Sequence, residues 1–257
     1  MDPIGLMKWK KHYEELFIEN RDEYKNASYE TMQEDLEEIG RITVKEVNEI
    51  LRRMKNHKAP GPGCTRIPIE LLKILTEFLN DCLFGEENPE ERNLALICSL
   101  QKKESRKDCG NYRGISVLAS MGKLYGRIIN QRIEREIKEN EKESGFRPGR
   151  SKIDNIFCLK QIAKKKLACG RKAHFVFIDL RKAYDSVPIS KLWTTMERNG
   201  VSKVYINAVK RLYKNTSSCI RIKNQISQSF IVDKGLRQGC HISPTFFKVF
   251  LNEALKN

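Results

Sequence analysis

The chain has 257 residues, 40% of them hydrophobic, which is enough to bury a sizeable core and excludes disorder along its whole length. Its formal net charge is +15, and the excess is uneven: residues 1–40 hold 5 basic and 11 acidic residues, whereas residues 41–257 hold 43 and 22. So basic a body is typical of proteins that bind polyanions such as nucleic acids, although charge alone fits an ordinary soluble surface equally well.

The eight cysteines are scattered without a C-x-x-C pair, and the first residues contain no apolar signal core. This pattern favours an intracellular protein, nuclear or cytoplasmic, over a secreted one. The adjacent Cys240 and His241 have no further ligands at zinc spacing, so we interpret them as structural. No apolar run reaches the roughly 18 to 20 residues of a membrane span, so no membrane contact is expected.

The first predicted elements are helices. Residues 1–42 are expected to form an acidic helical linker region ahead of the main body. Thr43 is followed by Glu46 in a capping-box pattern, and a helix with apolar residues at helical spacing begins there. The stretch "HKAPGPG" (57–63) ends this helix, because neither a helix nor a central strand tolerates alternating proline and glycine. A second helix is predicted from Ile69 to about Phe84.

Two short strands and two long helices come next. The strands are predicted at "LALICSL" (94–100) and "ISVLAS" (115–120), and the basic loop between them could lie over a phosphate or be an ordinary exposed hairpin. Apolar residues three and four apart predict helices from Leu124 to Ile137 and from Ile153 to Ala163. The stretch "ESGFRPGRS" (143–151) separates the two helices.

A strand is predicted from His174 to Leu180, with Asp179 near its end. A lone carboxylate at a buried strand end is costly, so Asp179 is expected to pair, to accept hydrogen bonds or to bind a metal. Two helices, a hairpin around Lys223 and Asn224, and a last amphipathic helix from Phe246 to Leu255 follow. Helices and hairpins with few long crossovers favour an α+β fold with an antiparallel sheet.

Four separate stretches together resemble the reverse transcriptases of non-LTR (LINE-type) retrotransposons. They occur in the family's order and near its spacing: "KAPGPG" (58–63), "NYRGISVL" (111–118) with "GFRPGRSKID" (145–154), "FIDLRKAYDSV" (177–187) and "GLRQGCHISP" (235–244). The resemblance implies a right-hand polymerase fold and a reverse transcriptase domain at 43–257, with fingers at about 43–170 and part of the palm at about 171–257. It further implies an RNA template, a DNA primer, deoxynucleoside triphosphates (dNTPs) and two Mg²⁺ ions.

The resemblance assigns the catalytic centre to Asp179, which matches the family's first metal-binding aspartate. That carboxylate would bridge two Mg²⁺ ions about 3.5 to 4 Å apart, and the main-chain carbonyl of Leu180 would add a ligand. Tyr184 matches the aromatic steric gate beneath the incoming sugar, with a core tyrosine as the alternative. Asp185 is expected to cap or pair locally rather than to bind metal.

The remaining assignments concern the dNTP and the nucleic acid. Gln238 and Gly239 match the loop that packs on the nascent base pair, where glycine permits close backbone approach. Arg113 matches the fingers arginine that clamps the triphosphate, with a surface arginine as the alternative. Arg147 and Arg150 lie in the family's template-side segment and are assigned to nucleic-acid contacts.

The sequence also departs from the family. Where many members carry proline and a small apolar residue, it has His241 and Ile242, and "GCTR" (63–66) follows the first motif instead of aspartate and glycine. The 257 residues contain no Asp-Asp pair and no thumb, whereas two-metal chemistry needs at least two convergent carboxylates. We therefore expect a fragment, truncated before the Asp-Asp motif and inactive alone. A non-catalytic nucleic-acid-binding remnant is the alternative, and a group II intron maturase would carry a different signature at "NYRGISVL".

Overall fold

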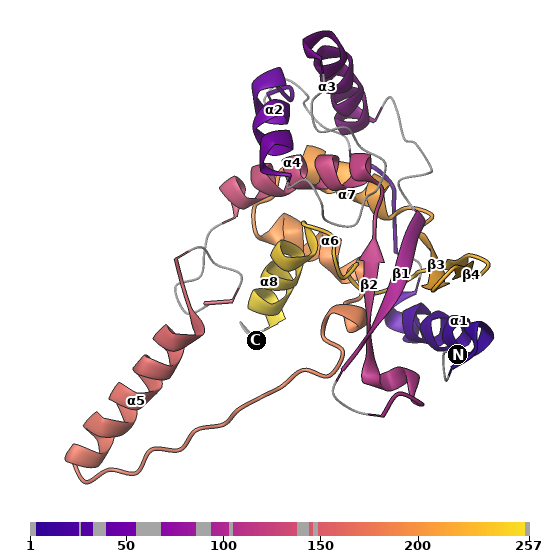
Figure 1. The fold of residues 1–257 in the computed structure, drawn as a ribbon. Helices are drawn as coiled ribbons and strands as arrows, with labels where there is room; N and C mark the ends of the chain where they lie inside the picture. Colours follow the sequence, from indigo (N-terminus) through magenta and orange to yellow (C-terminus); the bar gives the residue numbers. More distant parts are fainter. Residues whose placement is uncertain are drawn as a thin grey trace.

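The structure is a computed structural model, and it describes residues 4–25, 27–32, 40–54, 68–85, 94–102, 105–137, 144–145 and 149–254. Helices and strands are mixed in it, which confirms the α+β class (Figure 1). A helical body adjoins a small sheet, and one helix with the extended chain after it projects away from both. No helix in the described ranges is long and apolar enough to cross a membrane.

The helical body surrounds the larger of two hydrophobic cores. Buried side chains such as Val47, Leu79, Ile128 and Phe246 meet at its centre. Where α2 begins, the Thr43 side chain accepts a 3.2 Å hydrogen bond from the Glu46 N–H, so the predicted helix start is confirmed. The helices of the body are α2 (Val44–Arg53), α3 (Ile69–Phe84), α4 (Ser120–Glu136), α6 (Ile189–Arg198), α7 (Lys203–Tyr213) and α8 (Ser243–Ala254).

The sheet is mixed, so the predicted antiparallel sheet is wrong in part. Its strands are β1 (Leu94–Gln101), β2 (Tyr112–Val117), β3 (Ser217–Ile222), β4 (Gln225–Ile226) and β5 (Phe230–Ile231), in the order β2-β1-β3-β4, with β5 also paired to β3. Strands β1 and β2 are antiparallel, whereas β1 and β3 are parallel. The chain makes a long helical crossover between β2 and β3, and only such a connection lets a strand return in the parallel direction.

The hairpin predicted around Lys223 and Asn224 is confirmed, because β3 and β4 pair antiparallel on either side of it. Lys223 has a φ of 53°, in the left-handed region that tight hairpin turns use. Ile220 lies on β3 between the residues that pair with β4 and those that pair with β5. Its N–H donates to the Ser227 hydroxyl at 2.9 Å. A side chain therefore completes the pairing of β3.

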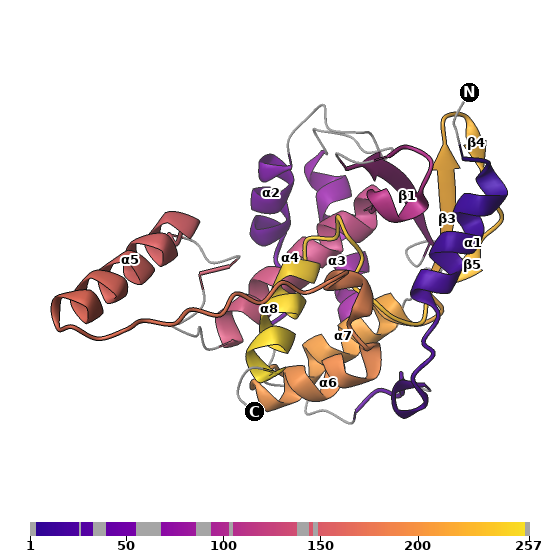
Figure 2. The same cartoon turned by 90° about the horizontal axis from the view of Figure 1, so that it is seen from below.

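Helix α1 (Leu6–Phe17) packs against the sheet and forms the second, smaller core. Trp9, Tyr13 and Phe17 lie on one side of the helix at intervals of four residues, and all three are buried. They meet Ile97 and Ile220 of the sheet. Figure 2 shows α1 alongside β3. This part of the acidic N-terminal segment is thus packed against the sheet, with the short helix η1 (Asp22–Tyr24) following it.

Helix α5 (Lys152–Ala168) and residues 171–180 together form an arm that leaves the body (Figures 1 and 2). None of the residues of α5 is buried. Residues 171–180 are extended without forming a strand, so the strand predicted from His174 to Leu180 is wrong. Phe177 and Ile178 are each 81% exposed. The run has strand-forming residues, but a strand needs a hydrogen-bonded neighbour, and no strand in the described ranges pairs with it.

Candidate functional site

The turn that follows the arm and the loop before α8 are tied together by backbone hydrogen bonds. The turn contains η5 (Tyr184–Ser186). The Leu236 N–H donates to the Tyr184 carbonyl at 2.8 Å, and the Gly235 N–H donates to the Val187 carbonyl at 2.9 Å. The Gln238 side-chain amide donates to Asp185 Oδ1 at 3.1 Å. Two of the motifs that carry the family resemblance therefore meet in space.

The same loop is pinned to β2 at Gly239. The Ser116 N–H donates to the Gln238 carbonyl at 2.6 Å. Gly239 has a φ of 110°, and a Cβ at this position would lie 2.6 Å from the Ser116 carbonyl oxygen. Only glycine combines that backbone conformation with that approach. The loop thus joins β2 to the turn at Asp185.

Asp185 is the half-buried carboxylate of this junction. Burial raises the pKa of Asp185, while the hydrogen bond from Gln238 and the charges of Lys182 and Lys102 lower it. Asp185 was expected to cap or pair locally, whereas its partner Gln238 lies 53 residues further along the chain. A carboxylate used in this way orders the loop around it, and the two lysines give its surroundings positive charge that suits an anionic ligand.

Tyr184 is half-buried at the edge of the helical body. Its ring stacks on Phe247 of α8, with ring centroids 4.8 Å apart and planes 18° from parallel. Burial raises the pKa of the Tyr184 phenol. The stacking holds the ring in one orientation beside the loop that carries Gln238. A steric gate, the role expected of Tyr184, needs such a fixed ring.

Residues 100–257 match the family described as Reverse transcriptase (RNA-dependent DNA polymerase). The match includes β2, the turn at Tyr184 and the loop at Gln238.

The chain belongs to this reverse transcriptase family.

Several relatives extend the similarity toward the N-terminus. The chain is 24% identical over 225 residues to the transposon TX1 uncharacterized 149 kDa protein of Xenopus laevis, which covers 83% of this chain and 17% of that protein. It is also 24% identical to two Drosophila proteins, with 81% of this chain and 24% of each relative covered. These are a probable RNA-directed DNA polymerase from transposon BS (Drosophila melanogaster) and the RNA-directed DNA polymerase from mobile element jockey (Drosophila funebris). The resemblance to non-LTR retrotransposon reverse transcriptases is confirmed. The chain spans about a sixth to a quarter of these relatives' length.

Two reverse transcriptase residues assigned from sequence, Asp179 and Leu180, lie apart from this junction, on the exposed arm. Lys182, with a φ of 53°, bends the chain between them and Tyr184. In the part of the chain that the structure describes, no three His, Cys, Asp or Glu side chains come close enough to hold a metal ion. That result includes the surroundings of Asp179, Asp185 and His241. The described residues therefore do not fit a two-Mg²⁺ site.

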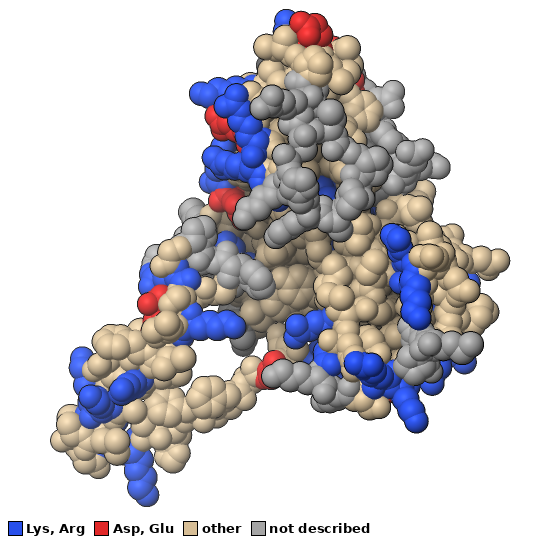
Figure 3. All heavy atoms as spheres, in the orientation of Figure 1, with Lys and Arg blue, Asp and Glu red and all other residues tan. Residues whose placement is uncertain are grey.

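The arginines assigned from sequence have separate positions. Arg113 is exposed on β2, opposite Leu100 of β1 and three residues before the Ser116 that holds the loop. Arg150 is exposed just before α5. Arg147 and the "KAPGPG" motif fall outside the described residues. Figure 3 shows Lys and Arg beside α2, along the arm and over the strands, with few acidic side chains on this face.

Two further features of the junction are absent from the sequence-based assignment. Tyr13 of α1 lies beside Gly114 of β2, and its hydroxyl hydrogen-bonds Ser99 Oγ of the neighbouring strand β1 at 3.1 Å. Burial raises the pKa of Tyr13 to about 12. Arg237, next to Gln238, is buried, and its guanidinium donates to the Leu212 carbonyl and the Thr216 hydroxyl. The spacing of Trp9, Tyr13 and Phe17 signals a buried face on α1, but nothing in the sequence indicates which surface covers it.

Proposed function

We propose that this chain supplies the fingers and part of the palm of an RNA-directed DNA polymerase of a non-LTR retrotransposon, acting inside the cell, in the nucleus or cytoplasm. In this proposal, residues 43–257 are the reverse transcriptase domain and residues 1–42 precede it. One observation carries the proposal: the family's separate motifs meet at the junction of β2, the Tyr184 turn and the Gln238 loop. The ligands are an RNA template, a DNA primer and dNTPs.

The junction suits contact with a nucleotide. Gly239 lets the loop pack directly on the backbone of β2, which fixes the loop in place. The nascent base pair would pack on the other side of this fixed loop. The stacked ring of Tyr184 forms a fixed wall that can exclude a 2'-hydroxyl. Arg113 projects from the strand that holds the loop, and its guanidinium fork can bind triphosphate oxygens. Arg147 and Arg150 remain proposed contacts to the nucleic-acid backbone.

Asp179 and the Leu180 carbonyl remain the proposed Mg²⁺ ligands of the family site. Because the described residues gather no group of three metal-ligating side chains around Asp179, we assign no catalytic step to this chain alone. A non-catalytic nucleic-acid-binding role is the second candidate function, and the exposure of Asp179 together with the charge of +15 favours it. The two candidates share ligands and differ only in turnover.

Labelled-primer extension on an RNA template, with Mg²⁺ and dNTPs, separates the two functions. The 257-residue chain and its Asp179→Asn variant should both show no extension. Extension by the unchanged chain above the variant would show that a second carboxylate acts within this chain, with Asp185 as the nearest candidate. In a longer chain that includes an Asp-Asp motif, Asp179→Asn should abolish extension, and rates within a few-fold of the unchanged protein would make Asp179 structural.

Binding of RNA and DNA oligonucleotides tests the function common to both candidates. Affinity should fall steeply as salt rises, because each neutralised phosphate contributes about 0.7 to 0.9 to the slope of log K against log salt. A flat salt titration, or no binding at low salt, would contradict any nucleic-acid function for this chain.

A further inference from the structure

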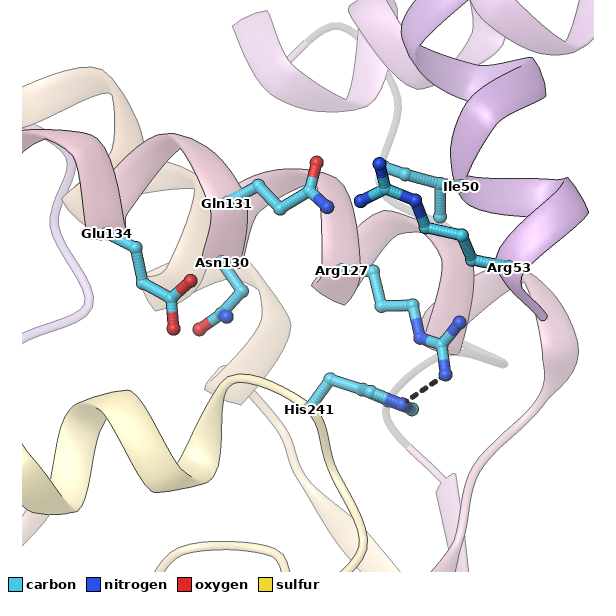
Figure 4. Close-up of a pocket in the computed structure, with 7 residues that line it drawn as sticks. All are labelled: Ile50, Arg53, Arg127, Asn130, Gln131, Glu134 and His241. Atoms are coloured by element: carbon cyan, nitrogen blue, oxygen red, sulfur yellow. Dashed lines mark hydrogen bonds between the residues drawn. The ribbon is translucent and has the colours of Figure 1, made fainter. Parts of the chain in front are cut away.

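A pocket of about 340 Å³ lies between α2, α4 and the loop before α8 (Figure 4). Side chains of both helices and of the loop line it, and most of them are polar or charged. They are Ile50, Arg53, Arg127, Asn130, Gln131, Glu134 and His241. None of these residues is among the site residues that the family resemblance assigns.

At one end of the pocket, Arg127 and His241 contact each other. Arg127 Nη2 lies 2.6 Å from His241 Nε2. A guanidinium can only donate a hydrogen bond, so Nε2 is the acceptor and carries no proton. His241 is therefore neutral in this arrangement. Burial and the charges of Arg127 and Lys123 lower the pKa of His241, which agrees with that state.

Arg53 of α2 extends toward the same pocket from the opposite wall (Figure 4). Within the described ranges, no carboxylate forms an ion pair with Arg53 or Arg127. Glu134 is the only acidic residue of the lining, and Figure 4 shows it at the other end, away from Arg127 and His241. Two guanidinium groups thus face a cavity without a neutralising partner in the described part of the chain.

A second observation also indicates a ligand. The side-chain oxygen of Asn130, which lines the pocket, is buried and has no hydrogen-bond partner among the described residues. A buried polar atom of this kind costs free energy unless something pairs with it. A turn of the Asn130 side chain into the pocket would let a sugar or base next to a bound phosphate supply the missing partner.

We propose that this pocket binds one backbone phosphate of a single nucleic-acid strand, held by Arg53 and Arg127. A guanidinium fork matches the oxygens of a phosphate, and helix α2 presents further positive charge beside the pocket, along which a strand can continue (Figure 3). The inference rests on the proposed function in one respect, namely that the ligand is a polynucleotide. It adds a contact site that shares none of the assigned nucleotide-binding residues.

His241 makes this site sensitive to pH. The charged groups that face it are Arg127 and Lys123 of α4 and Arg53 of α2, with Glu134 at the far end. A bound phosphate offsets those positive charges and raises the pKa of His241, so binding is accompanied by proton uptake. Affinity for the strand therefore rises as pH falls through the range in which His241 takes up its proton, while the phosphodiester keeps its charge throughout.

The test compares two charge-matched double variants by fluorescence anisotropy with a single-stranded RNA oligonucleotide. Arg53→Gln with Arg127→Gln removes the two pocket arginines, whereas Arg52→Gln with Arg135→Gln removes exposed arginines of the same two helices that do not line the pocket. The pocket variant should bind at least about tenfold more weakly and lose about 1 from the salt slope. The control should stay within about twofold. Equal losses in both variants overturn the pocket site.

A third variant keeps the proposal testable if Arg127→Gln disturbs the fold. His241→Gln retains an acceptor for Arg127 but cannot take up a proton, so it should bind as the unchanged chain does at pH 8 and lose the gain at pH 6. An unaltered pH dependence overturns the role of His241.

Displacement of the strand by submillimolar inorganic phosphate or dNTP would make this a free-anion site and overturn the strand assignment. If the unchanged chain binds no RNA, the proposed function fails together with this inference, whereas equal losses in the two double variants contradict only this inference.

Discussion

Helices α4 and α5 have the same length, 17 residues, and opposite surroundings. Seven residues of α4 are buried, and the helix contacts α2 and α7 in the middle of the body. No residue of α5 is buried, and Figure 1 shows it projecting from the body. Both segments have apolar residues at helical spacing. The periodicity thus predicts a helix in each case, but burial depends on whether another element covers the apolar side.

At their N-terminal ends, the exposed helix α5 has more hydrogen bonds from side chains than the buried helix α4. Helix α5 begins with a capping box in which Ser151 and Asp154 each bond the other's backbone, whereas no side chain caps the start of α4. A cap supplies partners for N–H groups that have none within the helix. A helix that lacks tertiary contacts depends on such local bonds, while a helix held by packing can do without them.

Truncating one isoleucine in each helix should give the largest difference. Ile128→Ala in α4 removes a side chain that is 0% exposed, and we expect a loss of about 2 to 5 kcal/mol in the free energy of unfolding. Ile156→Ala in α5, where the side chain is 63% exposed, should change it by about 0.5 kcal/mol or less. Urea denaturation of both variants measures this. Similar losses would show that α5 packs against the body in solution.

Removing the cap of α5 should have a smaller and purely local effect. Asp154→Ala deletes the acceptor of the Ser151 N–H bond, which is 2.7 Å long, and should weaken α5 by about 0.5 to 2 kcal/mol. Amide hydrogen exchange in α5 should quicken, while exchange in α4 and the urea midpoint stay unchanged. Lys152→Ala is the control in the same turn. A shift of the urea midpoint would mean that the arm contributes to global stability.

Asp185, at the point where the arm rejoins the body, should make the free energy of unfolding depend on pH. Burial raises the pKa of Asp185 above the ordinary 3.8, so the folded state holds this proton more tightly than the unfolded state does. Its contribution to stability is present at low pH and is lost as pH rises from 3.8 through the raised value.

Asp185→Asn removes that loss. As pH rises through this range, the free energy of unfolding of the variant should therefore increase relative to that of the unchanged chain. Asp179→Asn, on the exposed arm, should run parallel to the unchanged chain. Urea denaturation at a series of pH values compares the three proteins. Parallel curves for Asp185→Asn would show that its carboxylate is solvated.

The exposed side of the arm should affect association rather than stability. Large apolar side chains from Ile153 to Leu180 are exposed, and such a surface favours self-association. Ile156→Glu with Phe157→Glu should leave the free energy of unfolding within about 0.5 kcal/mol and raise the monomer fraction in sedimentation velocity. Gln161→Glu with Lys160→Glu, on the same helix, is the control. An unchanged monomer fraction would show that the arm does not cause the self-association.

Much of the local structure followed from the sequence by itself, because local rules act within one turn or one hairpin. The cap at Thr43, the helix from Ile69 to Phe84 and the turn at Lys223 were all predicted and are confirmed. The family also followed from short motifs, because their order along the chain is a property of the sequence.

Tertiary structure alone decided which elements meet. The parallel pairing of β1 with β3, the seat of α1 on the sheet and the bond from Gln238 to Asp185 each join residues far apart in the chain. Asp179 shows the same limit, since its apolar neighbours predicted a buried strand and the structure leaves them exposed. The physical reason is that strand pairing and burial are properties of two surfaces together. A sequence pattern describes only one of them.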